Sequence, residues 1–185
     1  LVVADMPFGS YEISDEEAVR NAVRLMKEGG AEAVKLEGGA RSAKVIRAIV
    51  DAGIPVCAHL GFTPQSVHSL GGFKIQGKGE SAKQLIADAK SIQAAGAFAV
   101  VLEMVPAALA AEIDQAIDIP TIGIGAGAGT TGQVLVWTDL VGLSDGPAKK
   151  FVKQYLDLRT QISEAASSYR EDVRANTFPG TEHSF

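Results

Sequence analysis

Short apolar runs alternate with amphipathic segments along the whole chain. The apolar runs have the length of buried strands, and they cover residues 1–4, 33–37, 54–60, 97–105, 119–124 and 133–138. The segments between them carry apolar residues at helical spacing, at about residues 15–28, 42–52 and 81–95, from 106 onward, and at 147–175. Strands that alternate with helices in this way predict βα units and a parallel sheet.

Two architectures accommodate six βα units: an open doubly wound sheet, and a (β/α)8 barrel that lacks two units. A complete barrel needs about 250 residues, whereas this chain has 185 and opens on LVVADMPF, inside an apolar run and without an initiator Met. We therefore predict an α/β fold of the (β/α)8 TIM-barrel type, of which the chain supplies about six units. The predicted single domain spans residues 1–185 and is N-terminally incomplete, with a long C-terminal helix at 147–175 and a tail at 176–185.

Composition and charge argue against several classes of protein. Apolar residues make up 46% of the chain and charged residues 21%, as in ordinary soluble globular proteins. The net charge is −5 and no basic run is present, so nucleic acid is not an expected partner. No apolar run reaches transmembrane length, and Cys57 is the single cysteine, so neither a membrane span nor an internal disulfide is expected. The expected location is cytoplasmic.

Ionisable side chains close four consecutive predicted strands: Asp5, then Lys35 with Glu37, then His59, then Glu103. The carboxyl ends of parallel strands form the ligand site of α/β folds. Lys35 and Glu37 are two residues apart, so they point to the same side of their strand. We expect these groups to line the floor of a pocket, where a bound metal, a substrate and the groups themselves satisfy one another.

Each of these residues also has a structural explanation. An aspartate after a strand is often a turn residue or a helix cap, Lys35 and Glu37 can form an ion pair at a sheet edge, and His59 can be a hydrogen-bonded core residue. Glu103 is harder to explain in this way, because apolar residues flank it in VVLEMVP. A carboxyl group in apolar surroundings suits general acid–base chemistry. Four consecutive strands with such endings favour a catalytic site over chance.

The run IGIGAGAG, residues 122–129, contains fragments of a dinucleotide-binding motif. That motif must open a helix, but the residues that follow, TTGQVLV, have the pattern of another strand. We therefore expect these glycines to form a turn or to let the backbone approach a ligand.

Several motifs resemble one known family in order and nearly from end to end. They are VADMPFGSY (3–11), VKLEGG (34–39), HLGFTPQ (59–65), GGFKIQGK (71–78), VLEMVP (101–106), IPTIGIGAG…GQVLVWTDLVGL (119–143) and FPGTEHSF (178–185). The family they resemble is ketopantoate hydroxymethyltransferase. Its members are (β/α)8 barrels of the phosphoenolpyruvate/pyruvate type, and the resemblance implies that this chain begins at their third strand, without the two strands that supply a further metal-binding aspartate and a substrate-binding serine.

The resemblance also implies a reaction. A hydroxymethyl group passes from 5,10-methylenetetrahydrofolate to 3-methyl-2-oxobutanoate through an Mg²⁺-stabilised enolate, which gives 2-dehydropantoate for pantothenate and coenzyme A biosynthesis. By the same resemblance, Asp5 and Glu37 bind Mg²⁺, Lys35 holds the substrate carboxylate, Asp5 and His59 belong to the substrate site, and Glu103 is the proton acceptor. Implied partners are these small molecules, further copies of the chain in a homo-oligomer (family members often form decamers), and the N-terminal segment that the chain lacks.

Small departures from the family pattern occur at Ala58, Phe62, Thr131 and Thr138, where Gly, Leu, Asp and His are common. Two alternatives stay open. One is an Mg²⁺-dependent 2-oxo acid lyase or mutase of the isocitrate lyase kind, although such a lyase carries its cysteine in a flexible loop and Cys57 lies in a predicted strand. The other is an inactive barrel fragment that needs its N-terminal part.

Overall fold

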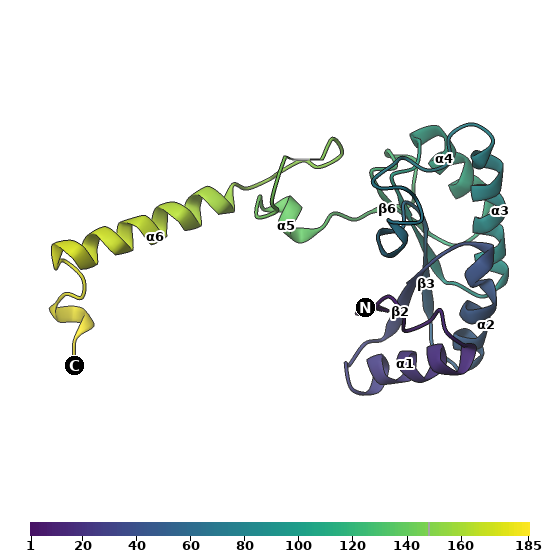
Figure 1. Ribbon diagram of the computed structural model, residues 1–185, viewed down its shortest axis with the longest axis horizontal. Helices are drawn as coiled ribbons and strands as arrows, with labels where there is room; N and C mark the ends of the chain where they lie inside the picture. Colours follow the sequence, from purple (N-terminus) through teal and green to yellow (C-terminus); the bar gives the residue numbers. More distant parts are fainter. Residues whose placement is uncertain (148) are drawn as a thin grey trace. The chain divides into compact units, whose positions relative to one another are not determined.

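The computed structural model describes residues 1–147 and 149–185. By its internal contacts the chain divides into two compact units, Leu1–Val134 and Leu135–Phe185, where the sequence predicts one domain. The first unit contains the sheet and the four helices that cover it (Figure 1). The second contains two helices and the C-terminal segment.

The sheet of the first unit consists of six parallel strands in the order in which they occur along the chain. The strands are β1 (Val3–Asp5), β2 (Ala33–Glu37), β3 (Val56–Gly61), β4 (Ala99–Glu103), β5 (Thr121–Ile124) and β6 (Gly132–Gln133). A doubly wound sheet reverses its strand order at a switch point, and this sheet has no such reversal. The order therefore identifies a segment of a barrel, in which β1 and β6 are the edge strands.

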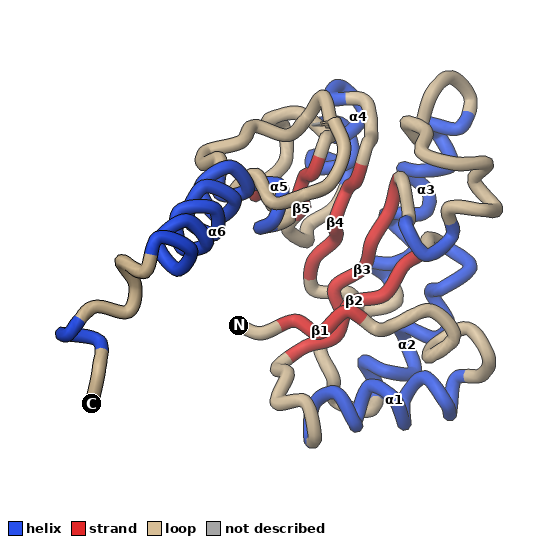
Figure 2. The backbone as a smooth tube through the Cα atoms, turned by 60° about the vertical axis from the view of Figure 1, so that its left-hand side comes forward, coloured by secondary structure: helices blue, strands red, loops and turns tan. Residues whose placement is uncertain are grey.

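Four helices lie on one face of this sheet (Figures 1 and 2). They are α1 (Asp15–Lys27), α2 (Ala43–Asp51), α3 (Ser81–Ala94) and α4 (Ala107–Ala116). Their starts follow local signals: the Ser14 hydroxyl accepts a hydrogen bond from the backbone N–H of Glu17 at 3.1 Å, and Pro106 is the N-cap residue of α4. The predicted helices of this unit are confirmed to within a few residues.

The hydrophobic core lies between the helices and the sheet. Helix residues such as Ile46, Ile49 and Ile92 are fully buried there together with Leu36 and Leu102 of the strands. Burying one such side chain contributes about 1.5–3 kcal/mol to stability. Because strand residues alternate between the two faces, the residues between these core positions point to the opposite face, which we call the inner face of the sheet.

The glycine run between β5 and β6 packs against α4. A Cβ atom on Gly127 would lie 2.4 Å from the Ala107 methyl group, and a Cβ on Gly129 would lie 2.7 Å from the Ala111 methyl group. The run leads into β6 and not into a helix. These two glycines are therefore needed for close packing of the loop on α4. This packing explains the glycine-rich run without a role in dinucleotide binding.

The sixth strand is shorter than predicted. The apolar run at 133–138 predicts six residues of strand, but β6 contains only Gly132 and Gln133, and the short helix α5 (Trp137–Leu140) takes up the end of the run. The reason is that β6 is an edge strand with one neighbour in the described part of the chain, so no second ladder of hydrogen bonds extends it.

The second unit corrects the predicted start of the C-terminal helix. Helix α6 runs from Leu158 to Ala175, whereas the sequence predicts a start near 147. Asp157 is its N-cap residue, and the carboxylate accepts a hydrogen bond from the backbone N–H of Thr160 at 3.3 Å. The periodicity of apolar residues alone did not predict this N-cap. The predicted tail contains a turn of 3-10 helix, η3 (Thr181–His183). Within the described residues, every helix is too short or too polar to cross a membrane.

Candidate active site at the strand ends

The ionisable residues at the strand ends all project from the inner face of the sheet. In β2, Val34 and Leu36 belong to the core, so Lys35 and Glu37 point the other way. The same alternation in β3 and β4 places His59 and Glu103 on the inner face. Parallel pairing brings the carboxyl ends of these strands to one edge, so the predicted residues gather in one place. All of them belong to the first unit.

Lys35 and Asp5 form an ion pair on neighbouring strands. The two residues are partners in the β1–β2 register, and Lys35 Nζ lies 2.8 Å from Asp5 Oδ2. The Lys35 side chain is 17% exposed and that of Asp5 is 56% exposed, so the pair lies at the open side of the site. Lys35 is thus held by Asp5, one of the two residues that the sequence predicts as metal ligands.

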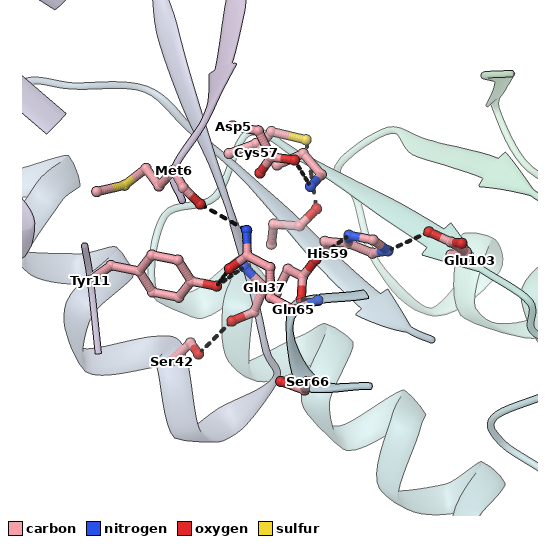
Figure 3. A network of polar contacts seen from close by, with 12 residues as sticks. Asp5, Met6, Tyr11, Glu37, Ser42, Cys57, His59, Gln65, Ser66 and Glu103 are labelled. Atoms are coloured by element: carbon pink, nitrogen blue, oxygen red, sulfur yellow. Dashed lines mark hydrogen bonds and ion pairs between the residues drawn. The ribbon is translucent and has the colours of Figure 1, made fainter. Parts of the chain in front are cut away.

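His59 lies between two carboxylates (Figure 3). Its Nδ1 is 3.7 Å from Glu37 Oε1, and its Nε2 is 3.3 Å from Glu103 Oε2. The ring is buried, and neither nitrogen has a partner with hydrogen-bond geometry in the described part of the chain. A buried polar atom without a hydrogen-bond partner costs free energy. Such atoms are typical of sites that bind a ligand.

Glu37 is buried but well supported. Its Oε2 accepts a hydrogen bond from the backbone N–H of Gln65 at 3.1 Å, and the Ser42 hydroxyl donates to its carbonyl oxygen at 3.0 Å. Burial raises the pKa of the Glu37 carboxyl group, while His59 and Lys35 act in the opposite direction. Its Oε1 is turned toward His59 and thus toward the centre of the site.

The comparisons with known proteins agree on one family. A sequence model of ketopantoate hydroxymethyltransferase matches residues 1–181. The chain belongs to the ketopantoate hydroxymethyltransferase family. A 3-methyl-2-oxobutanoate hydroxymethyltransferase of Arthrobacter sp. (strain FB24) is 63% identical over 185 residues, which are 100% of this chain and 62% of that protein. The relative from Leifsonia xyli subsp. xyli (strain CTCB07) is 59% identical, and 66% of it is covered. The chain thus spans less than two thirds of these relatives.

Solved structures share the fold at low sequence identity. Phosphonopyruvate hydrolase superposes with a TM-score of 0.53 at 13% identity, over 99% of this chain and 64% of that one. A putative phosphonomutase from Burkholderia cenocepacia J2315 gives a TM-score of 0.51 at 17% identity, over 65% of this chain and 52% of that one. The chain therefore has an α/β fold in which six parallel strands form part of a barrel, as predicted.

Cys57 does not have the properties of a nucleophile. It is buried in β3, in register with Lys35, and burial raises the pKa of the thiol to about 11. A thiol with such a pKa is almost entirely protonated near pH 7, and the thiolate is the reactive form. This observation weighs against a lyase that uses a cysteine.

The carboxylate oxygens of Asp5 and Glu37 fit a magnesium ion by their chemistry. Mg²⁺ is a hard cation that proteins usually bind through one or two carboxylates, with waters and substrate oxygens as the other ligands. Residues 1–147 and 149–185 contain no cluster of three or more His, Cys, Asp or Glu side chains that could hold a metal. Two carboxylates at the ends of adjacent strands suit Mg²⁺ and not an ion that requires a cage of protein ligands.

The end of β4 is fixed by backbone contacts from β3. Gly61 has a φ of +89°, and the backbone N–H of the following Phe62 donates to the Glu103 carbonyl oxygen at 2.8 Å. Met104, directly after Glu103, has a φ of +50°, and its carbonyl oxygen accepts from the backbone N–H of Gln76 at 3.0 Å. The loop after β3 is thereby fastened next to the predicted proton acceptor.

Replacing Gly61 with alanine is expected to destabilise the protein and to displace Glu103. The new Cβ would lie 2.2 Å from the Glu103 carbonyl oxygen, and the positive φ alone costs roughly 1–3 kcal/mol. Gly53→Ala is a matched control, because Gly53 has a similar φ of +86° with no atom within 4 Å of the new Cβ. Denaturant unfolding should show a larger loss of unfolding free energy for Gly61→Ala. Equal losses would mean that the close approach is unimportant.

Two residues of the site were missed by sequence reasoning. Tyr11 and Gln65 contact the main chain or the carboxylate of Glu37 from the loops after β1 and β3. The resemblance motifs contain both residues, but a loop position carries no periodic pattern that would indicate where the side chain points.

Proposed function

We propose that the whole protein transfers a hydroxymethyl group from 5,10-methylenetetrahydrofolate to 3-methyl-2-oxobutanoate and forms 2-dehydropantoate. The observation that carries the proposal is the row of Glu37, His59 and Glu103 at the strand ends, with 3.7 and 3.3 Å between the His59 nitrogens and the two carboxylates, in a chain of this family. Because the chain spans about 62% of its relative from Arthrobacter, the proposal concerns the whole protein.

Glu103 is the proposed proton acceptor. The oxo acid must lose the proton on C3, next to its keto group, before C3 can form a carbon–carbon bond to the one-carbon unit. Water supplies the hydroxyl oxygen of that unit, and tetrahydrofolate leaves as the two bonds between its nitrogens and the methylene carbon break. The Glu103 side chain is 17% exposed and thus reachable from the inner face, whereas Glu37 and His59 are 3% exposed. Glu103 can take the C3 proton, and its Oε2 lies 3.3 Å from His59 Nε2.

Asp5 and Glu37 are the proposed ligands of Mg²⁺. When bound, the ion supplies a Lewis acid for the keto oxygen and the carboxylate of the substrate. Lys35 brings a positive charge to the same carboxylate, and its ion pair with Asp5 holds its ammonium group at the edge of the site. A homo-oligomeric state and a cytoplasmic location stay predictions from the sequence.

The direct test is an assay of the whole protein with both substrates. We expect 2-dehydropantoate to form only when the oxo acid and the folate are both present, to disappear with EDTA, and to return when Mg²⁺ is added back. The arm that contains oxo acid without folate tests the lyase alternative. Cleavage or rearrangement of a 2-oxo acid without folate would overturn the proposed transfer, and so would a folded protein that forms no product.

A further inference from the structure

The side chain of Gln65 joins the loop that follows β3 to the loop that follows β1. Gln65 lies in a turn of 3-10 helix after β3, η2 (Pro64–Ser66). Its Oε1 accepts a hydrogen bond from the Tyr11 hydroxyl at 2.6 Å, and its Nε2 donates to the carbonyl oxygen of Met6 at 2.9 Å (Figure 3). Tyr11 and Met6 both belong to the loop after β1.

The hydrogen bonds around Gln65 have a fixed direction. The Tyr11 hydroxyl has one proton, which it donates to Gln65, so its lone pairs face the backbone N–H of Glu37, which donates to it at 3.3 Å. The backbone N–H of Gln65 in turn donates to Glu37 Oε2 at 3.1 Å. Tyr11 and Glu37 are buried and Gln65 is half-buried, so these bonds are largely shielded from water. Gln65 thus contacts Glu37 both directly and through Tyr11.

The same side chain also fixes the residue after Asp5. Met6 follows Asp5, its N–H donates to the Lys35 carbonyl oxygen at 2.8 Å, and its own carbonyl oxygen is held by Gln65. Strand β1 is a three-residue edge strand, and in the described part of the chain it pairs with β2 alone. A neutral amide is suited to this position, because it donates at one end and accepts at the other without adding charge beside two carboxylates.

We infer that Gln65 is a positioning residue that sets the spacing between the Asp5 and Glu37 carboxylates and thereby the affinity of the site for a divalent cation. The inference rests on the proposed function, in which these two carboxylates bind Mg²⁺. Gln65 does so without contacting the ion: it ties the peptide group after Asp5 to the main chain and the carboxylate of Glu37. Groups that orient metal ligands in this way usually alter metal affinity by roughly 10–100-fold.

The test is a titration of the whole protein with Mg²⁺ by calorimetry and with Mn²⁺ by electron paramagnetic resonance. Gln65→Met keeps the length of the side chain and removes both of its hydrogen bonds. We expect the dissociation constants for both ions to rise roughly 10–100-fold. Tyr11→Phe removes two bonds of the same network, the one to the Gln65 amide and the one from the Glu37 N–H, and should weaken binding as well. The effect of the double variant should be less than additive.

Gln93→Met is the matched control. Gln93, in α3, also bonds at both ends of its amide: it accepts from the backbone N–H of Asp118 at 2.6 Å and donates to the Asp118 carboxylate at 3.2 Å. It has no bond to the loops at the strand ends, so its loss should lower stability and leave metal affinity unchanged.

The outcomes separate this inference from the proposed function. If the wild type binds neither ion, the proposed metal site is wrong. If the wild type binds and Gln65→Met binds within two-fold of it, the inference is overturned, and equal weakening by Gln93→Met overturns it too. If Gln65→Met does not fold, Tyr11→Phe decides in its place, because unchanged metal affinity in that variant contradicts the network that the inference requires.

Discussion

Replacing Glu103 with glutamine in the whole protein is expected to lower kcat by about 10²–10⁴-fold, the usual size of a general acid–base contribution. The amide has the shape of the carboxylate but cannot accept the C3 proton. The expectation depends on the placement of Glu103 at the end of β4, on the inner face and 3.3 Å from His59. Steady-state kinetics at saturating oxo acid and folate measure the effect.

Binding measurements on the same variant separate chemistry from structure. Mg²⁺ and oxo acid should still bind, because the proposed ligands Asp5, Glu37 and Lys35 are unchanged. Glu112→Gln on α4 makes the same chemical change at an exposed position and should retain wild-type turnover. Wild-type turnover in Glu103→Gln, or a loss of metal binding as severe as that of Glu37→Gln, would show that Glu103 is not the base.

Replacing Glu37 with glutamine should abolish metal binding at ordinary Mg²⁺ concentrations. We expect the affinity to fall by more than about 100-fold, beyond the effect of residues that only orient ligands, and kcat/KM to fall with it. The glutamine oxygen can still accept the bond from the Gln65 N–H, so the surrounding loops should hold. Calorimetric titration with Mg²⁺ gives the affinity, and thermal unfolding gives the state of the fold.

Glu12→Gln is the control for Glu37. The Glu12 carboxylate accepts hydrogen bonds from the backbone N–H groups of Gly9 and Tyr11 in the same part of the molecule but does not close a strand. Its replacement should leave metal affinity within a few-fold of the wild type. If Glu37→Gln bound Mg²⁺ normally and still lost activity, Glu37 would act on substrate or on His59 and not as a ligand.

The core strands and the location of the site were predictable from local pattern. Apolar runs of strand length predicted β1 to β5, because strands that are buried against helices consist mostly of apolar residues. The sequence indicated four ionisable residues at strand ends, because burying an unpaired charge in a core costs free energy. These residues are Lys35, Glu37, His59 and Glu103. The length of the chain favoured a barrel over an open doubly wound sheet, and the strand order in the structure confirmed that choice.

The features that the sequence did not predict depend mostly on contacts between segments that are distant in the sequence. The role of Gln65 follows from contacts between the loops after β1 and β3, and the residues next to it in the sequence do not indicate these contacts. The same holds for Gly127 and Gly129, whose purpose becomes visible only against the methyl groups of α4. In β6 and α6, apolar spacing overstated the length of regular structure, because an edge position and an N-cap at Asp157 decided the boundaries.

The strand order of the sheet also has a consequence for biosynthesis. Each strand from β2 to β6 pairs with the strand translated just before it, so a nascent chain meets a finished partner whenever a new strand leaves the ribosome. Contacts between sequence neighbours favour rapid folding, and the sheet can grow in the direction of translation without waiting for a distant segment. A ribosome that stalls after β4 would leave the open edge of β4 without β5, and an unpaired edge of this kind promotes aggregation of partly made chains.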